Sequence, residues 1–189
     1  MIYYFFSILL GLVFGSFLNV IIYRLPKRIF FSNTRSFCPK CKYKIPFYSN
    51  IPILSFLIQL GKCAKCNQSI SIQYPLVEFL SALIWLWASL NYNLYQGVLF
   101  IWISSILMTI SIIDNKTFII PFELILSAFI GLLVYLLINP SEWKISFWGL
   151  IMGVGYLSLV FLLTSAIFNK QTLGLGDLQL IAITGMWLG

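Results

Sequence analysis

The sequence predicts an all-α fold: a polytopic helical membrane protein with one small cytoplasmic loop domain. Three observations lead to this prediction. Of the 189 residues, 60% are hydrophobic and only 9% are charged, whereas soluble domains carry about 25% charged residues. Apolar runs of roughly 20 residues, the length that crosses a bilayer, recur along the chain. One polar segment, residues 24–73, interrupts them and contains all four cysteines.

Five apolar runs are long enough to span the membrane: 2–23, 74–90, 95–113, 118–138 and 146–168. A sixth run begins at Leu178 and has only 12 residues, so we expect the sequence to be truncated at its C-terminus. The predicted domains are a first transmembrane helix over 1–23, the loop over 24–73, and further transmembrane helices over 74–189. The short run 50–60 cannot span, and it is either interfacial or packed inside the loop.

Basic residues concentrate in the loop and set the predicted orientation. Nine of the twelve lysines and arginines lie between Arg24 and Lys65, and all five carboxylates follow residue 77. Because cytoplasmic loops carry an excess of positive charge, the loop is predicted to be cytoplasmic. Alternating the spans then places Lys116 and Lys170 on the same side and only Lys144 outside. The expected partner of the loop is a bilayer surface with anionic headgroups, and no nucleic acid is expected.

Two CxxC pairs in the loop predict a metal site. Cys38, Cys41, Cys63 and Cys66 form two pairs separated by 21 residues, slightly more than is usual for such modules. Two knuckles of two thiolates each can close a tetrahedron around Zn²⁺. Two disulfides or a redox pair are the alternatives, and a reducing cytoplasm disfavours both. A four-cysteine site has no open ligand position, so we expect structural zinc and a zinc-binding loop domain.

The absence of histidine restricts the possible chemistry. Without His, a Ser-His-Asp triad, a Cys-His pair and a His-ligated metal site are excluded. Asp114 and Asp177 lie at the ends of apolar runs on the predicted cytoplasmic face, where a carboxylate is costly and usually functional. A facing pair can share a proton, so that one acts as base on a water while the other polarises a peptide carbonyl. That is the chemistry of an aspartyl protease.

Local features give the two aspartates different expected roles. Asp177 lies at a predicted helix N-terminus and Asp114 at a C-terminus, so the helix dipoles favour Asp177 as the base. Gly174 and Gly176 allow the backbone to approach an extended substrate and to adopt angles that other residues avoid. The alternatives are an Asp177 that only caps its helix and an Asp114 that only belongs to a polar turn. A proton-coupled membrane transporter with two carboxylate proton carriers is another.

Ordered motifs along nearly the whole chain resemble the type IV prepilin peptidase family. They are GSFLNVIIYRLP (15–26), the CxxC pairs around NIPILSFL, YPLVE (74–78), IIDNKTFIIP, GYLSL (155–159) and GLGDLQL. The resemblance implies an aspartyl protease of the bacterial cytoplasmic membrane that cleaves the basic leader of prepilins or pseudopilins, with Asp114 and Asp177 catalytic. It also implies N-methylation of the new terminus from S-adenosylmethionine, an activity associated with the cysteine loop.

The chain departs from the family pattern at three positions. Phe122, Gln179 and Gln73 stand where the family usually has Asp, Lys and Arg. These three differences leave the aspartates unaffected and bear on substrate contacts and methylation. A presenilin-like GxGD protease would share the second aspartate motif and would not explain the cysteine loop.

Polar and small residues inside the spans predict helix contacts. Glu78 is expected either to pair with Arg24 or a neighbouring lysine, or to serve methyl transfer. The GxxxG spacings predict close approach of helices; they are Gly11 with Gly15, and Gly149 with Gly153.

Overall fold

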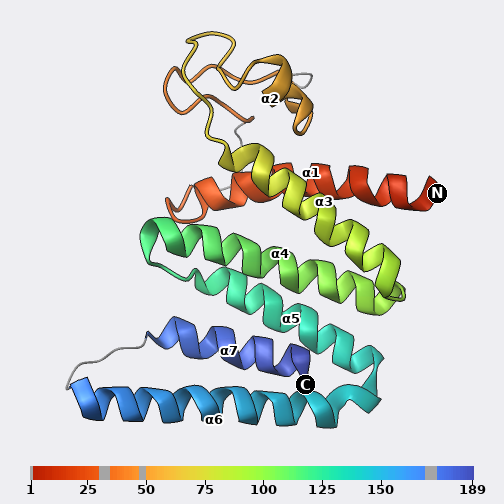
Figure 1. Cartoon of the computed structure of the whole chain (residues 1–189), viewed down its shortest axis with the longest axis vertical. Coiled ribbons are helices and arrows are strands. Elements are labelled where there is room, and N and C mark those ends of the chain that lie inside the picture. The colour runs from red at the N-terminus through yellow and green to blue at the C-terminus, as the bar shows by residue number, and fades with distance from the viewer. Residues whose placement is uncertain (1, 30–34, 47–49, 169–173) are drawn as a thin grey trace. The chain divides into compact units, whose positions relative to one another are not determined.

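Helices make up nearly all of the regular structure that the chain forms (Figure 1). The computed structural model describes residues 2–29, 35–46, 50–168 and 174–189, so Lys170 lies outside the described residues. The helices are α1 (Ile2–Arg24), α2 (Leu54–Ile58), α3 (Gln73–Asn91), α4 (Leu94–Thr117), α5 (Phe122–Ile138), the 3-10 helix η2 (Pro140–Glu142), α6 (Trp143–Phe168) and α7 (Leu175–Leu188). Two compact units, Met1–Ile112 and Ile113–Gly189, divide within α4.

These helices confirm the predicted all-α membrane fold. Within the described ranges, three helical segments are long and apolar enough to cross a bilayer: Ile2–Arg24, Leu94–Thr117 and Pro140–Ile167. The predicted run 118–138 becomes helical only at Phe122. Its first residues connect two helices, because Phe118 adopts a left-handed φ of 53° and Pro121, extended at ψ 123°, caps α5.

In the unit Met1–Ile112, α1 and α3 pack as an antiparallel pair. The Ser7 hydroxyl donates to the Trp85 carbonyl at 2.9 Å, and the Asn19 amide donates to the Tyr74 carbonyl at 3.0 Å. Between these bonds, a Cβ on Gly15 would lie 2.6 Å from Glu78 Cα, and a Cβ on Gly11 would lie 2.7 Å from Ala82 Cα. The first predicted GxxxG contact is therefore confirmed, and it is a contact of backbone on backbone.

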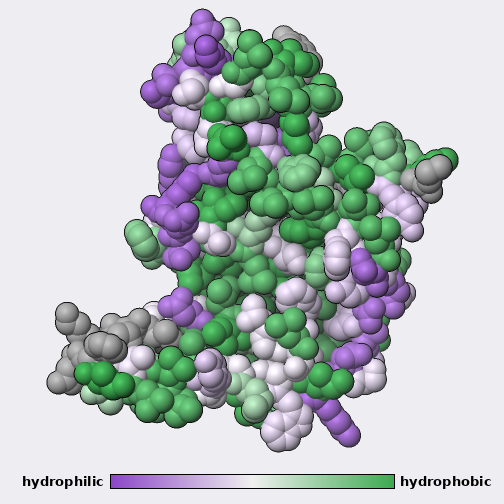
Figure 2. All heavy atoms as spheres, in the orientation of Figure 1, coloured by the Kyte–Doolittle hydropathy of each residue, from purple (hydrophilic) through white to green (hydrophobic). Residues whose placement is uncertain are grey.

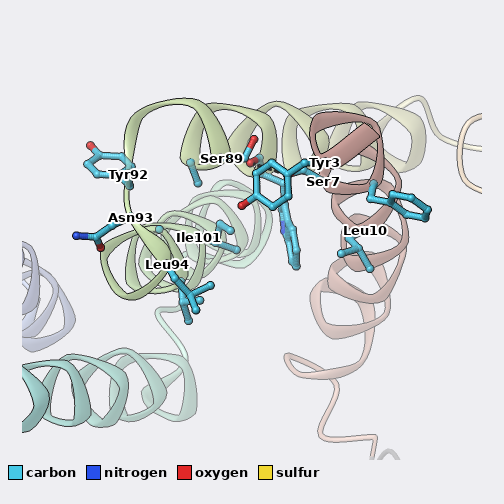
Figure 3. Close-up of a pocket in the computed structure, with 13 residues that line it drawn as sticks. Tyr3, Ser7, Leu10, Ser89, Tyr92, Asn93, Leu94 and Ile101 are labelled. Carbon is cyan, nitrogen blue, oxygen red and sulfur yellow. Dashed lines mark hydrogen bonds between the residues drawn. The ribbon is translucent and has the colours of Figure 1, made fainter. Parts of the chain in front are cut away.

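The same unit has a small pocket at the end of α1 that is remote from the loop. Its volume is about 160 Å³, and residues of α1, α3 and α4 line it. Figure 3 shows Tyr3 and Ser7 of α1 beside Ser89 of α3. The residues predicted from the sequence to form a site do not line this pocket.

In the unit Ile113–Gly189, α7 packs between α5 and α6 (Figure 1). A Cβ on Gly153 would lie 3.2 Å from the Ile181 carbonyl oxygen, and one on Gly149 would overlap the carbonyl of Gly185. The second predicted GxxxG contact is thus also confirmed. Because of this tight packing, α6 fixes the position of α7, the helix whose first turn carries Asp177.

Candidate active site and metal centre

The four cysteines come together in the loop, as the sequence predicts. Their Sγ atoms all lie within 4.8 Å of one another, with 3.9 Å between Cys38 and Cys66 and 4.0 Å between Cys41 and Cys63. Tetrahedral thiolates at a Zn–S distance of about 2.3 Å are separated by about 3.8 Å. The spacing of the four sulfurs is therefore that of a metal site. All four thiols are free, so the two alternative disulfides are not formed.

Each CxxC pair is built on the same backbone turn. The N–H of Lys42 donates to the Cys38 carbonyl at 3.0 Å, and the N–H of Asn67 donates to the Cys63 carbonyl at 2.9 Å. Both donors follow the second cysteine directly and have left-handed φ angles, 58° for Lys42 and 52° for Asn67. The CxxC spacing alone does not point to these two residues. Their identical position after each pair, and the tolerance of Asn for this conformation, were the available signals.

Backbone donors inside these turns favour the thiolate form that a metal requires. The N–H groups of Cys66 and then Lys65 lower the pKa of Cys63 to about 6, and that of Cys41 lowers the pKa of Cys38. For Cys66 the N–H of Gln68 lowers the pKa, but burial and the three neighbouring sulfurs outweigh it and raise the pKa to about 11. Four sulfurs this close repel one another as anions, and a divalent cation between them would remove the repulsion.

Glu78 lies between α1 and α3 and is only 7% exposed. Its carboxylate accepts a 2.7 Å hydrogen bond from the backbone N–H of Ile53 and another from the Ser16 side chain. The bond to Ile53 connects α3 to the cysteine loop, a link that no sequence motif indicated. The pairing of Glu78 with the buried Arg24 stays a prediction.

The two aspartates occupy the helix ends that the sequence predicts. Asp114 lies in the last turn of α4, and its carbonyl accepts the N–H of Phe118 at 2.8 Å. Asp177 lies in the first turn of α7, where its carboxylate accepts the N–H of Gly174 at 3.1 Å. The Asp177 side chain is exposed and that of Asp114 is half-buried. This contact fits the alternative in which Asp177 only caps its helix. It uses one carboxylate oxygen, and the other stays available.

Gly176 brings the segment after Asp114 against the segment that carries Asp177. A Cβ on Gly176 would lie 3.1 Å from Ile120 Cβ, and Ile120 follows Asp114 by six residues. Gly174 has an ordinary extended backbone at φ −85°, and neither glycine is among the left-handed residues. The expectation of unusual backbone angles was therefore wrong for both glycines. Gly176 serves close packing against Ile120, a residue that sequence analysis did not single out.

Comparison with known proteins assigns this chain to a family. The model for the bacterial peptidase A24 N-terminal domain matches residues 9–92, and the model for the type IV leader peptidase family matches residues 99–189. A prepilin leader peptidase/N-methyltransferase of Pectobacterium carotovorum subsp. carotovorum is 37% identical over 95% of this chain and 73% of its own length.

Two further relatives with the same name agree. The one from Klebsiella pneumoniae is 36% identical over 97% of this chain and 84% of its own length. The one from Pseudomonas putida is 31% identical over 95% of this chain and 71% of its own length. No solved structure matches the chain significantly. The matches extend over both halves of the sequence and include the cysteine loop and both aspartates, and the chain therefore belongs to the type IV leader peptidase family.

Proposed function

We propose that this chain is a membrane aspartyl endopeptidase that cleaves the basic leader peptide of type IV prepilins or pseudopilins. Its relatives are prepilin leader peptidases. The observation that carries the assignment of residues is the contact between Ile120 and Gly176. It joins the loop that follows Asp114 to the turn that presents Asp177, in a chain that has no histidine to supply another base.

Asp177 and Asp114 would divide the acid-base work between them. Asp177, at the positive end of α7, would accept a proton from the attacking water. Asp114, at the negative end of α4, would be the protonated partner that donates a hydrogen bond to the scissile carbonyl. The tetrahedral intermediate would then collapse as the leaving amine takes up the proton that Asp177 accepted from the water, which restores the Asp177 carboxylate. Gly174 is exposed and has no side chain of its own, which would leave room for an extended substrate next to the Asp177 carboxylate.

The loop would serve the second activity in the relatives' names, N-methylation of the newly exposed terminus. Its four thiols fit Zn²⁺ in number and spacing. The zinc would hold the two knuckles together and, with all four positions filled by sulfur, would take no part in the reaction. S-adenosylmethionine would supply the methyl group.

The protein would reside in the bacterial cytoplasmic membrane, with the loop and both aspartates on the cytoplasmic side. The distribution of positive charge supports this orientation, since nine of twelve basic residues lie between Arg24 and Lys65. The domains would be the first transmembrane helix (1–23), the zinc-binding loop (24–73) and the peptidase helices (74–189).

Substituting the aspartates tests the proposal. In cells that also express a prepilin, Asp114→Asn or Asp177→Asn should each reduce leader removal by about 10²–10⁴-fold, the usual contribution of a positioned acid or base. Glu123→Gln is the matched control, because Glu123 is an exposed carboxylate in the first turn of α5. Gel mobility of the precursor reports cleavage. Normal processing by either Asn variant would refute the assignment.

A further inference from the structure

The loop has an apolar edge that its own fold does not cover. In and beside α2, Leu54 is 54% exposed, Leu57 59%, Ile58 80% and Leu60 84%. Phe56 instead turns inward, where its ring lies 3.1 Å from the position of a Cβ on Gly61. The sequence left open whether the run 50–60 is packed inside the loop. The structure excludes this for the four exposed side chains.

Charge indicates what covers this edge. The segment 24–73 contains nine lysines and arginines and no carboxylate, and Lys62 and Lys65, both exposed, follow Leu60 closely. Figure 2 shows hydrophobic atoms on the α2 side of the loop and hydrophilic atoms on its other side. An apolar edge flanked by positive charge matches an anionic leaflet. It would repel a prepilin leader, which is basic.

A hydrogen bond holds this edge beside the membrane helices. Ile53, the residue before α2, donates its N–H to the buried carboxylate of Glu78 at 2.7 Å. Glu78 is the sixth residue of α3, so at 1.5 Å per residue it lies only about 7.5 Å along the helix from Gln73. The start of α2 is therefore held near the level at which α3 enters the membrane.

The backbone of Ile53 adopts a conformation that contacts with the surrounding structure must maintain. Its φ of 60° and ψ of −49° are rare for a β-branched residue, and such a conformation persists only when its surroundings hold it. The hydrogen bond to Glu78 is one such restraint, and it acts at the residue that sets the direction of α2.

We propose that residues 51–60 form an interfacial anchor that inserts Leu54, Leu57, Ile58 and Leu60 into the anionic cytoplasmic leaflet, held at that depth by the bond from Ile53 to Glu78. The anchor would fix the zinc-binding loop against the membrane surface. It takes the cytoplasmic orientation from the proposed function and does not depend on proteolysis.

Photocrosslinking of the full chain in phosphatidylglycerol-containing vesicles tests the anchor. We expect p-benzoylphenylalanine at Ile58 to give phospholipid adducts, detected by mass spectrometry, at least fivefold more often than the same residue at Gln68, an exposed polar position on the second knuckle. Adducts at Ile58 with another segment of this chain, with a co-reconstituted prepilin, or with no lipid would each overturn the proposal. An Asp114→Asn background should leave the lipid adducts unchanged, so failure of the protease assignment is read separately.

The role of Glu78 is tested in the same assay. Glu78→Ala removes the acceptor and should reduce lipid adducts at Ile58 severalfold, whereas Glu78→Gln keeps a carbonyl oxygen and should retain most of them. Bound zinc, measured in the same samples, shows whether the loop is still folded. Equal adducts in Glu78→Ala and the wild type would refute the positioning role. If Glu78→Ala fails to fold, Glu78→Leu replaces it, because leucine fills most of the same space and has no acceptor for the Ile53 N–H. Fewer adducts in Glu78→Leu with normal zinc support the positioning role, and unchanged adducts refute it.

Discussion

Lys42 and Asn67 have the same backbone conformation at the same place in two separate turns. Each N–H closes a turn onto the first cysteine of its pair, and each φ is left-handed. CxxC spacing predicts the ligands because thiolates that share a metal need this spacing. It does not reveal the residue that follows, because the strain there depends on how the turn closes. Gly176 is similar, since only the fold shows that it faces Ile120.

Substitution of Lys42 should change how firmly the loop retains its metal. Lys42→Gly removes the penalty of about 1–2 kcal/mol for a side chain in this conformation, while Lys42→Val increases it. Both lose the contact of the Lys42 ammonium with the Phe37 ring, so the difference between them isolates backbone strain. Zinc release to a chelator should be slower in the Gly variant than in the Val variant. Equal rates would contradict a strained turn.

Gly176→Ala should impair cleavage through Ile120. The new methyl group would lie 3.1 Å from Ile120 Cβ and 3.2 Å from its Cδ1, so the turn carrying Asp177 must shift. Displacements of about 1 Å can cost 10²-fold in rate, and we expect a loss of about 10-fold or more in prepilin processing.

Two further variants check this mechanism. Adding Ile120→Val removes the Cδ1 and should restore part of the activity. Gly155→Ala is the control, because a Cβ there meets nothing within 4 Å. A normal rate of processing by Gly176→Ala would show that the turn accepts the methyl group without displacing Asp177.

At the scale of the helices, runs of apolar residues predicted where the helices lie better than any local motif predicted the contacts between them. The five predicted runs overlap helices α1, α3, α4, α5 and α6. Of these, α1, α4 and the segment containing α6 are long and apolar enough to cross a bilayer, whereas α3 and α5 do not meet that criterion. The start of α5 was misplaced by four residues, because Phe118 and Ile119 are apolar yet lie in the connection. The bond from Ile53 to Glu78 was beyond prediction, because nothing local relates residues 25 apart.

Gly15→Ala should destabilise the α1–α3 pair. The added Cβ would lie 2.6 Å from the Cα of Glu78, and backbone yields less readily than a side chain. Overpacking of this kind costs about 1–3 kcal/mol, which thermal unfolding in detergent should report as a lower Tm. Gly97→Ala is the matched helical control, since its nearest neighbour would be 3.7 Å away. Equal melting temperatures for the two variants would mean that α1 and α3 move apart to accept the methyl group without loss of stability.

At the scale of the whole molecule, the cysteines and the aspartates belong to different compact units. The metal cluster lies in Met1–Ile112, and Asp114 and Asp177 lie in Ile113–Gly189. Sequence could not show the contact of Ile120 with Gly176 inside the second unit, because it depends on how α5 and α7 pack.

Removing the metal should therefore separate the two activities. A strong chelator, or Cys63→Ser, should release about one zinc per chain, as read by elemental analysis, and abolish methylation of the new terminus. Leader removal should remain within a factor of about three, because Asp114 and Asp177, the proposed catalytic pair, lie in the other unit. Parallel loss of both activities at the same zinc content would show that cleavage also needs the loop.

The antiparallel register of α1 and α3 has a consequence for how this protein family can vary. Ser7 meets Trp85 and Asn19 meets Tyr74, so the chain leaves α1 and re-enters α3 at neighbouring points. The closure free energy of such an excursion changes by only about 0.6 kcal/mol for each doubling of its length. Shortening or lengthening the inserted loop would therefore cost the helical hairpin little closure free energy, as long as the loop stays flexible enough to join its two ends.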